Sequence, residues 1–197
     1  MPKNLGFRHM RIVGGAYRGR KLEAPADDTV RPTTDRVREA IFNILGHNQP
    51  PLPRGAKVLD LFSGTGAFGL EALSRGAAQT VFVDRAMASL NLSKNNARNL
   101  GVMDQCTFVK ADASNLKGSS LFAESGAAGL VFADPPYDRG LLAPALVSGR
   151  DAGWIDLESY ILAETASRET VDLGPDFEVT NEWTYGYSKI TRISLAR

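Results

Sequence analysis

The chain has 197 residues, of which 43% are hydrophobic and 23% charged, and this composition predicts an ordinary soluble globular protein. Its single cysteine excludes an internal disulfide, and no apolar run approaches the roughly 18 residues that a membrane span needs. The N-terminus has no apolar segment resembling a signal peptide, so we expect a cytoplasmic protein with no membrane partner.

The net charge of +1 hides an uneven distribution of charged residues. Residues 1–38 carry nine basic and four acidic side chains, a net charge of +5, so the rest of the chain sums to −4. A basic arm on a faintly acidic body suits the binding of a polyanion. A solvated, charged terminus with no binding role would give the same count.

The N-terminal part predicts a small hairpin followed by a helix. Residues 11–22 predict two short extended pieces with glycines at the turns. Apolar side chains then recur at helical spacing over residues 37–45. Thr34 or Asp35 can cap this helix at its start, and Gly46 can end it.

A proline-rich stretch, residues 48–55, predicts a linker between this part and the rest of the chain. We therefore expect an N-terminal basic hairpin and helix extension over residues 1–48. The main domain would occupy residues 49–197.

The main domain predicts strands that alternate with helices. The expected strands are 58–62, 80–84, 106–110, 129–134, 159–164, 177–183 and 189–196, and the expected helices are 68–75, 86–100 and 141–148. Early alternation predicts a parallel, doubly wound α/β sheet. The last two strands, joined by a short turn, predict an antiparallel hairpin at its edge.

A glycine-rich loop follows the first of these strands. Its glycines, Gly64, Gly66 and Gly69, fit the G-x-G-x-x-G pattern, which suits both dinucleotides and S-adenosylmethionine. Asp60 ends the strand, where a carboxylate repels a pyrophosphate but attracts the ammonium and sulfonium of S-adenosylmethionine. We therefore expect Asp60, Ser63, Gly64 and Gly66 to bind this methyl donor.

Two further acids follow later strands. Asp84 ends the second strand, where a carboxylate can accept hydrogen bonds from both ribose hydroxyls, although NAD sites share this feature. Asp112 follows the third strand and can accept a hydrogen bond from the adenine amino group. Either acid could instead cap a turn or helix. Open α/β sheets bind ligands at the carboxyl ends of their strands, where both acids are expected.

The sharpest motif is Asp134-Pro135-Pro136-Tyr137, directly after the fourth strand. The prolines stiffen the backbone and remove two N–H donors, which leaves the Asp134 carboxylate and the Pro135 carbonyl as acceptors. These two groups can hold the hydrogens of a planar exocyclic amine and aim its lone pair at a methyl carbon. Tyr137 can stack on a flipped-out base. The sulfonium supplies the electrophile, so we expect no metal; the structural alternative is a rigid turn with a capping aspartate.

From Met10 onward, nearly the whole chain resembles the RsmD family of 16S ribosomal RNA guanine-N2 methyltransferases. The resemblance rests on RIVGGAYRGRKL (11–22), RPTTDRVREAIFNIL (31–45), DLFSGTGAFGLEALSRGA (60–77) and DPPY (134–137). The second segment is far more specific than the glycine loop or DPPY. The resemblance implies a Rossmann-like, seven-stranded class I methyltransferase sheet with a small N-terminal β-hairpin.

The resemblance also implies roles for individual residues. Gly64 and Gly66 would lie against the donor, Asp84 and Asp112 would bind its ribose and adenine, and Asp134 and Tyr137 would hold the target base. We expect six side chains to contact the RNA: Arg11, Arg18 and Arg20 in the basic arm, and Arg31, Thr33 and Arg36 near the cleft. The expected partner is 16S rRNA in the small ribosomal subunit or its assembly intermediate, bound by a monomer.

Three other functions stay open on the sequence alone. DPPY also occurs in DNA adenine-N6 and cytosine-N4 methyltransferases, although no recognisable separate DNA-recognition domain fits in this length. The glycine pattern alone allows an NAD-type oxidoreductase. A noncatalytic RNA-binding module with a degenerate site is the third alternative, against which the intact acidic residues argue.

Overall fold

The computed structural model describes residues 10–25, 34–116 and 126–196. Seven strands form its one sheet: β1 (Lys57–Leu61), β2 (Gln79–Asp84), β3 (Cys106–Lys110), β4 (Leu130–Ala133), β5 (Tyr160–Ala166), β6 (Phe177–Tyr185) and β7 (Ser188–Leu195). The helices are α1 (Asp35–Gly46), α2 (Ala67–Ser74), α3 (Met87–Leu100) and α4 (Leu142–Asp151), with short 3₁₀ turns η1 (Met103–Gln105) and η2 (Ala113–Asn115). Every strand and helix expected from residue 34 onward is present, with bounds that differ by a few residues at most.

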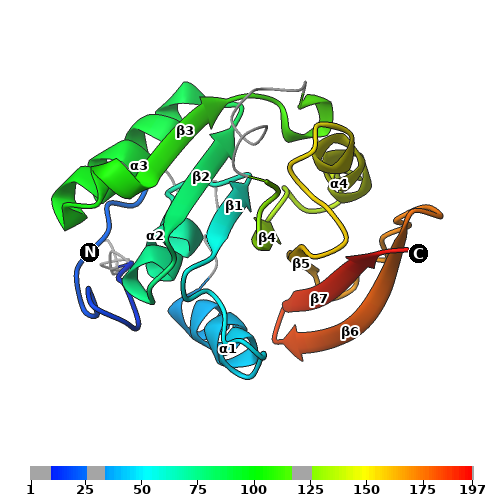
Figure 1. Cartoon of the computed structure of the whole chain (residues 1–197), viewed down its shortest axis with the longest axis horizontal. Coiled ribbons are helices and arrows are strands. Elements are labelled where there is room, and N and C mark those ends of the chain that lie inside the picture. The colour runs from blue at the N-terminus through cyan, green and yellow to red at the C-terminus, as the bar shows by residue number, and fades with distance from the viewer. Residues whose placement is uncertain (1–9, 26–33, 117–125, 197) are drawn as a thin grey trace, which may run out of the picture.

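The strand order is β3-β2-β1-β4-β5-β7-β6 (Figure 1). The first five strands in this order are parallel, and β7 joins β5 and β6 by antiparallel pairing. The expected parallel sheet with a closing antiparallel hairpin is therefore confirmed. The order reverses between β1 and β4, and such a switch point is where open α/β sheets bind ligands.

Two hydrophobic clusters cover the two faces of the sheet. Since successive side chains of a strand point to opposite faces, Val58 belongs to one cluster and Leu59 to the other. Helices α1, α2 and α3 contribute to the first cluster, and α4 and η2 to the second. Phe68 of α2 stacks between Phe42 of α1 and Phe132 of β4, with ring centroids 5.0 and 3.9 Å away.

Local sequence accounts for the ends of the helices. The Thr34 side chain caps α1 by accepting a hydrogen bond from the backbone N–H of Val37, as expected. Gly46 is the last residue of α1, and the helix is capped by His47. Helix α3 ends at Gly101, whose φ of 77° favours glycine. No helix in the described ranges is long and apolar enough to cross a bilayer.

The expected N-terminal hairpin is reduced to a single antiparallel bridge between Arg11 and Lys21. The reason lies in α2, which takes up backbone groups that a longer ladder would use. The N–H groups of Val13 and Gly14 both donate to the Glu71 carboxylate at 2.7 Å. The segment is therefore attached to the helix that follows the glycine loop.

Helix α1 shares its hydrophobic cluster with the sheet. Ile41 and Leu45 are fully buried in the same cluster as Leu70 of α2 and Phe82 of β2. The division into parts at residues 48 and 49 stays a prediction.

Candidate active site

A cavity of about 440 Å³ lies at the carboxyl ends of β1, β2, β3 and β4. Its wall includes one polar or flexible group from the segment after each strand: Gly64 after β1, Asp84 at the end of β2, Asp112 after β3 and Asp134 after β4. Val83, Ala111 and Leu141 supply apolar surface between them. Drug-sized and cofactor ligands usually bind in cavities of this volume, with a few polar groups on a largely apolar wall.

The Asp84 carboxylate is held in place by the backbone. One oxygen accepts a hydrogen bond from Gly64 N–H at 2.9 Å, and the other accepts from Ala86 N–H at 2.8 Å. A carboxylate has about four lone-pair sites, so it can accept further hydrogen bonds while these two fix its position. The geometry suits an acceptor for a pair of vicinal hydroxyls.

Asp112 is exposed and lines the cavity. Its Oδ1 accepts hydrogen bonds from the Ser114 backbone N–H at 2.9 Å and from its hydroxyl at 2.7 Å. The Ser114 hydroxyl and N–H lower the pKa of Asp112, so the side chain is ionised at neutral pH. Asp112 caps η2 as the sequence alternative allowed, and it also lines the cavity.

Asp60 lies beneath the glycine loop and does not line the cavity. It is 2% exposed, and its Oδ2 accepts a hydrogen bond from Gly69 N–H at 3.0 Å. Burial raises the pKa of this carboxyl well above its usual value, which opposes the charge that would attract a cation. The alternation of side chains along β1 explains the position, because Asp60 shares the face of Val58 on which α2 packs. In this structure Asp60 holds the glycine loop through Gly69, and its role in binding the donor stays a prediction.

The three glycines of the loop differ in their surroundings. Gly64 lines the cavity with a φ of 52°, whereas Gly66, also in the left-handed region, packs against α3. A Cβ on Gly66 would lie 3.0 Å from Ser93, and one on Gly69 would overlap Phe82 and Thr80. Gly66 thus allows the close approach of the loop to α3, and its contact with the donor stays a prediction.

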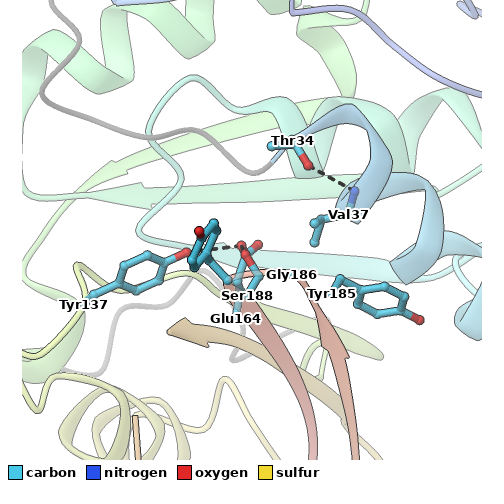
Figure 2. Close-up of a pocket in the computed structure, with 8 residues that line it drawn as sticks. Thr34, Val37, Tyr137, Glu164, Tyr185, Gly186 and Ser188 are labelled. Atoms are coloured by element: carbon cyan, nitrogen blue, oxygen red, sulfur yellow. Dashed lines mark hydrogen bonds between the residues drawn. The ribbon is translucent and has the colours of Figure 1, made fainter. Parts of the chain in front are cut away.

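The residues of DPPY lie on the wall of the same cavity as Asp84. Asp134, Pro135, Pro136 and Tyr137 all line it, and Pro135 is buried. The Tyr137 hydroxyl donates a hydrogen bond to Glu164 of β5 at 3.3 Å, and the ring points toward that carboxylate (Figure 2). Burial, with the nearby charges of Glu164 and Asp134, raises the pKa of Tyr137 to about 12, so the phenol is neutral at physiological pH.

Two non-glycine residues beside the cavity have a left-handed backbone conformation. Phe62, before the glycine loop, has a φ of 61°, and Asp138, after DPPY, has a φ of 56°. Such conformations cost free energy and concentrate where a loop must take a specific course.

The protein family described as Conserved hypothetical protein 95 matches residues 10–194. Ribosomal RNA small subunit methyltransferase D from Escherichia coli K12 is 39% identical over 165 residues, which cover 83% of this chain and 78% of that protein. The Bacillus subtilis protein YlbH is 34% identical over 182 residues, which cover 92% of this chain and 96% of that protein. The solved structure of yhhF from E. coli matches with a TM-score of 0.74 and 35% identity, covering 95% of this chain and 98% of that chain.

The chain belongs to the RsmD family. Its fold is that of the class I methyltransferases, as the sequence predicted. Chemistry in this class depends on S-adenosylmethionine.

The cavity of this RsmD family member has two acidic side chains on its wall beside apolar residues. The backbone-held Asp84 faces it, and Asp112 stands beyond the apolar wall formed by Val83 and Ala111. Among the described residues nothing hydrogen-bonds the buried Oγ of Ser63, which lies between the cavity-lining Phe62 and Gly64. A buried hydroxyl that makes no hydrogen bond within the described protein, and that lies next to a cavity, suits a hydrogen bond to a bound molecule.

Four of the expected RNA-binding residues, Arg11, Arg18, Arg20 and Arg36, lie within the described part of the chain. Arg11 makes an ion pair with Asp35 at 3.4 Å, and Arg20 donates to the Asn99 carbonyl at 2.6 Å. Arg18 and Arg36 are exposed, while Arg31 and Thr33 lie outside the described residues. Within the described ranges, none of these arginines lines either this cavity or its neighbour beyond Tyr137. Their contact with RNA stays a prediction.

Glu164 is a residue that sequence reasoning assigned only to a strand. It is 1% exposed, and its Oε1 accepts hydrogen bonds from Tyr137 and, at 2.7 Å, from Ser188. A charged side chain inside the apolar run SYILAE was the available signal, because buried acids are rare unless paired or functional.

Proposed function

We propose that this protein transfers a methyl group from S-adenosylmethionine to the N2 amine of a guanine in 16S rRNA of the small ribosomal subunit. One observation carries the proposal: the residues of DPPY and the backbone-held Asp84 line one cavity. An amine-orienting array and a ribose-binding carboxylate in one cavity suit amine methylation better than hydride transfer. The choice of 16S rRNA follows the E. coli relative, which is a ribosomal RNA small subunit methyltransferase.

The donor, when bound, supplies an electrophilic methyl group on a sulfonium. Gly64, Asp84 and Asp112 would hold it, and the neutral ring of Tyr137 would stack on the flipped-out base, a contact worth roughly 1–3 kcal/mol. The Asp134 carboxylate and the Pro135 carbonyl accept hydrogen bonds from the base amine and turn its lone pair toward the methyl carbon. The nitrogen then loses its extra proton to Asp134 or to water. Orientation and fixed charge supply most of the acceleration.

The basic arm would dock the RNA through its phosphates. Arg18 and Arg36 are exposed and available for such contacts. Phosphate contacts release counterions, so RNA affinity should fall steeply as salt concentration rises. The protein would act as a monomer.

The test supplies enzyme and isotopically labelled donor to small subunits from a strain that lacks this methyltransferase. Nucleoside mass spectrometry of the digested 16S rRNA should detect N2-methylguanosine. Asp134→Ala should nearly abolish turnover and leave donor binding intact, whereas the exposed Asp104→Ala should retain full activity.

Three results would contradict the proposal. Label on adenine-N6 or cytosine-N4, in RNA or in a DNA control, would indicate another amine substrate. RNA binding without any methyl transfer would indicate a binding module. Normal turnover by Asp134→Ala would remove DPPY from the chemistry.

A further inference from the structure

The turn that follows DPPY carries an exposed arginine beside the donor cavity. Tyr137 and Leu141 both line the cavity, and Arg139 lies between them in the chain. Arg139 itself is exposed and is not part of the described cavity wall. Two residues of chain span at most about 7 Å, so the backbone of Arg139 stays close to Tyr137. Arg139 therefore lies at the mouth of the site, next to the ring that would stack on the target base.

Two residues with left-handed backbone set the course of this turn. Asp138 has a φ of 56° and Gly140 has a φ of 60°, one on each side of Arg139. Aspartate adopts this region more readily than most other residues, although the conformation still costs free energy. Helix α4 begins directly afterwards, at Leu142. The place of Arg139 is thus fixed by a short, defined turn between DPPY and α4.

The guanidinium of Arg139 makes no hydrogen bond or ion pair with any other residue in the described ranges. Other arginines of the chain are paired: Arg75 contacts Glu71 at 2.8 Å, and Arg150 contacts Asp176 at 2.7 Å. A guanidinium presents its N–H donors in a planar fork that matches the oxygens of a phosphate or carboxylate. Arg139 can therefore offer this fork to an anion that comes from outside the protein.

The described wall of the cavity is acidic overall. It contains three aspartates: Asp84, Asp112 and Asp134. One arginine, Arg85, also lines it, and hydrogen bonds from Ser114 together with the weaker effect of the Arg85 charge lower the pKa of Asp112. A polyanion that approaches such a wall is repelled unless cations lie on its path. Arg139 supplies a positive charge on the side of the cavity where DPPY lies.

Two anions could reach this arginine: a phosphate of the RNA and the carboxylate of the methyl donor. The donor would lie inside the cavity, whereas Arg139 lies outside the described wall. Base flipping turns a nucleotide about its backbone, so the base enters the site while the phosphates on either side of it stay at the mouth. Contacts to phosphates commonly fix the position of a nucleic acid on its protein. The placement of Arg139 therefore favours the phosphate.

We propose that Arg139 is a substrate-binding residue that holds a phosphate group next to the target nucleotide while its base lies against Tyr137. This inference rests on the proposed function. It adds a contact at the mouth of the site to those expected of the basic arm, and it gives the turn after DPPY a role in keeping the flipped nucleotide in place.

The first test measures the affinity for small subunits from a strain that lacks this methyltransferase, between about 50 and 200 mM salt. Arg139→Gln should bind about 10-fold more weakly at low salt, because it removes a hydrogen bond to a charged group. The slope of log affinity against log salt should become shallower by about 0.7–0.9, the value of one phosphate contact. Arg139→Lys keeps the charge and should keep the wild-type slope. The matched control is Arg54→Gln, which changes an exposed arginine at the opposite, amino end of β1 and should behave as wild type.

The second test locates the phosphate. Ethylation removes the charge of single phosphates in 16S rRNA, which is then reconstituted into small subunits and separated into bound and unbound fractions. Ethylation next to the methylated nucleotide should weaken binding of the wild-type enzyme and should have no further effect on Arg139→Gln, because the two changes remove the same contact. Calorimetry with S-adenosylmethionine alone should give the same affinity for both proteins.

Three results would overturn the inference. Arg139→Gln could bind subunits with the wild-type affinity and salt slope, which would exclude a phosphate contact. Its lost contact could map to a phosphate far from the methylated nucleotide. It could lose affinity for S-adenosylmethionine, which would assign the arginine to the donor carboxylate. A wild-type enzyme that methylates another amine refutes the guanine assignment of the proposed function instead, and the salt slopes still decide the role of Arg139.

Discussion

Replacing Gly69 by alanine places a methyl group where the structure has no room for one. An added Cβ would lie 2.6 Å from Thr80 Cγ2 and would overlap the Phe82 ring as well. Both neighbours are fully buried on β2, a strand between two others, and Phe82 stacks on Phe108 at 5.1 Å. Neither side chain can move away without disturbing the sheet, so α2 itself must shift.

The size of the effect follows from two opposing terms. Replacing glycine by alanine inside a helix stabilises the helix by about 1 kcal/mol through helix propensity. Overpacking in a rigid core costs about 1–3 kcal/mol and occasionally more, and this overlap belongs at the upper end. We expect Gly69→Ala to lower the free energy of unfolding by about 1–2 kcal/mol, which corresponds to about 2–8 °C in the unfolding midpoint for a chain of this size.

Gly46 offers a matched control, since it is also helical and nothing lies within 4 Å of its added Cβ. Gly46→Ala should be as stable as the wild type or up to about 1 kcal/mol more stable. Urea or thermal unfolding of both variants checks the pair. A Gly69→Ala protein as stable as Gly46→Ala would refute the reasoning from close packing. Because Gly69 N–H binds Asp60 beneath the glycine loop, the destabilised variant should also bind S-adenosylmethionine more weakly.

Three further changes test other parts of the structure. Asp84→Ala removes a fixed, charged acceptor and should weaken S-adenosylmethionine binding by about 10- to 150-fold in calorimetry; unchanged affinity would exclude Asp84 from the donor site. Glu71→Ala removes a buried carboxylate that holds two backbone N–H groups and two arginines, and should cost about 3–5 kcal/mol in urea unfolding, whereas the exposed Glu39→Ala should stay within about 0.5 kcal/mol of the wild type. The pKa of Tyr137 rises from 10.0 to about 12, so the folded state holds the phenol proton more tightly, and this stabilisation is complete below pH 10 and is lost toward pH 12. Tyr137→Phe should therefore flatten the alkaline decline of stability, and an identical decline in both proteins would contradict the assignment.

Local patterns were sufficient to predict most of the fold. The alternation of strands and helices from residue 57 predicted all seven strands of the sheet, and Thr34 was identified as a helix cap. These features depend on side-chain spacing and capping chemistry within a few residues, which a single sequence displays directly.

The direction of individual side chains was harder to predict. The sequence placed Asp60 at the end of β1 but did not show that the pleat of this strand turns it under α2; its contact with the donor stays a prediction. Gly66 fits a ligand-binding pattern, yet it is needed for the approach of the loop to Ser93 on α3. Both outcomes depend on which neighbouring element packs above the loop, and the glycine pattern alone carries no such information.

Residues placed by long-range pairing could not be predicted. Glu164 comes next to Tyr137 and Ser188 because β5 pairs with β4 on one side and β7 on the other. Glu71 contacts backbone groups 57 and 58 residues earlier in the chain. An acid within each apolar segment was the visible sign, but the partner of each acid depends on the assembled sheet.

The attachment of residues 13 and 14 to Glu71 has a consequence for synthesis on the ribosome. A growing chain exposes this segment first, while the carboxylate that receives its backbone N–H groups is added 57 or 58 residues later. During that interval the segment has no folded surface to join. Helix α2 also follows the glycine loop, so the arrival of this one helix both fastens residues 13 and 14 and supplies the Gly69 N–H that Asp60 accepts beneath that loop.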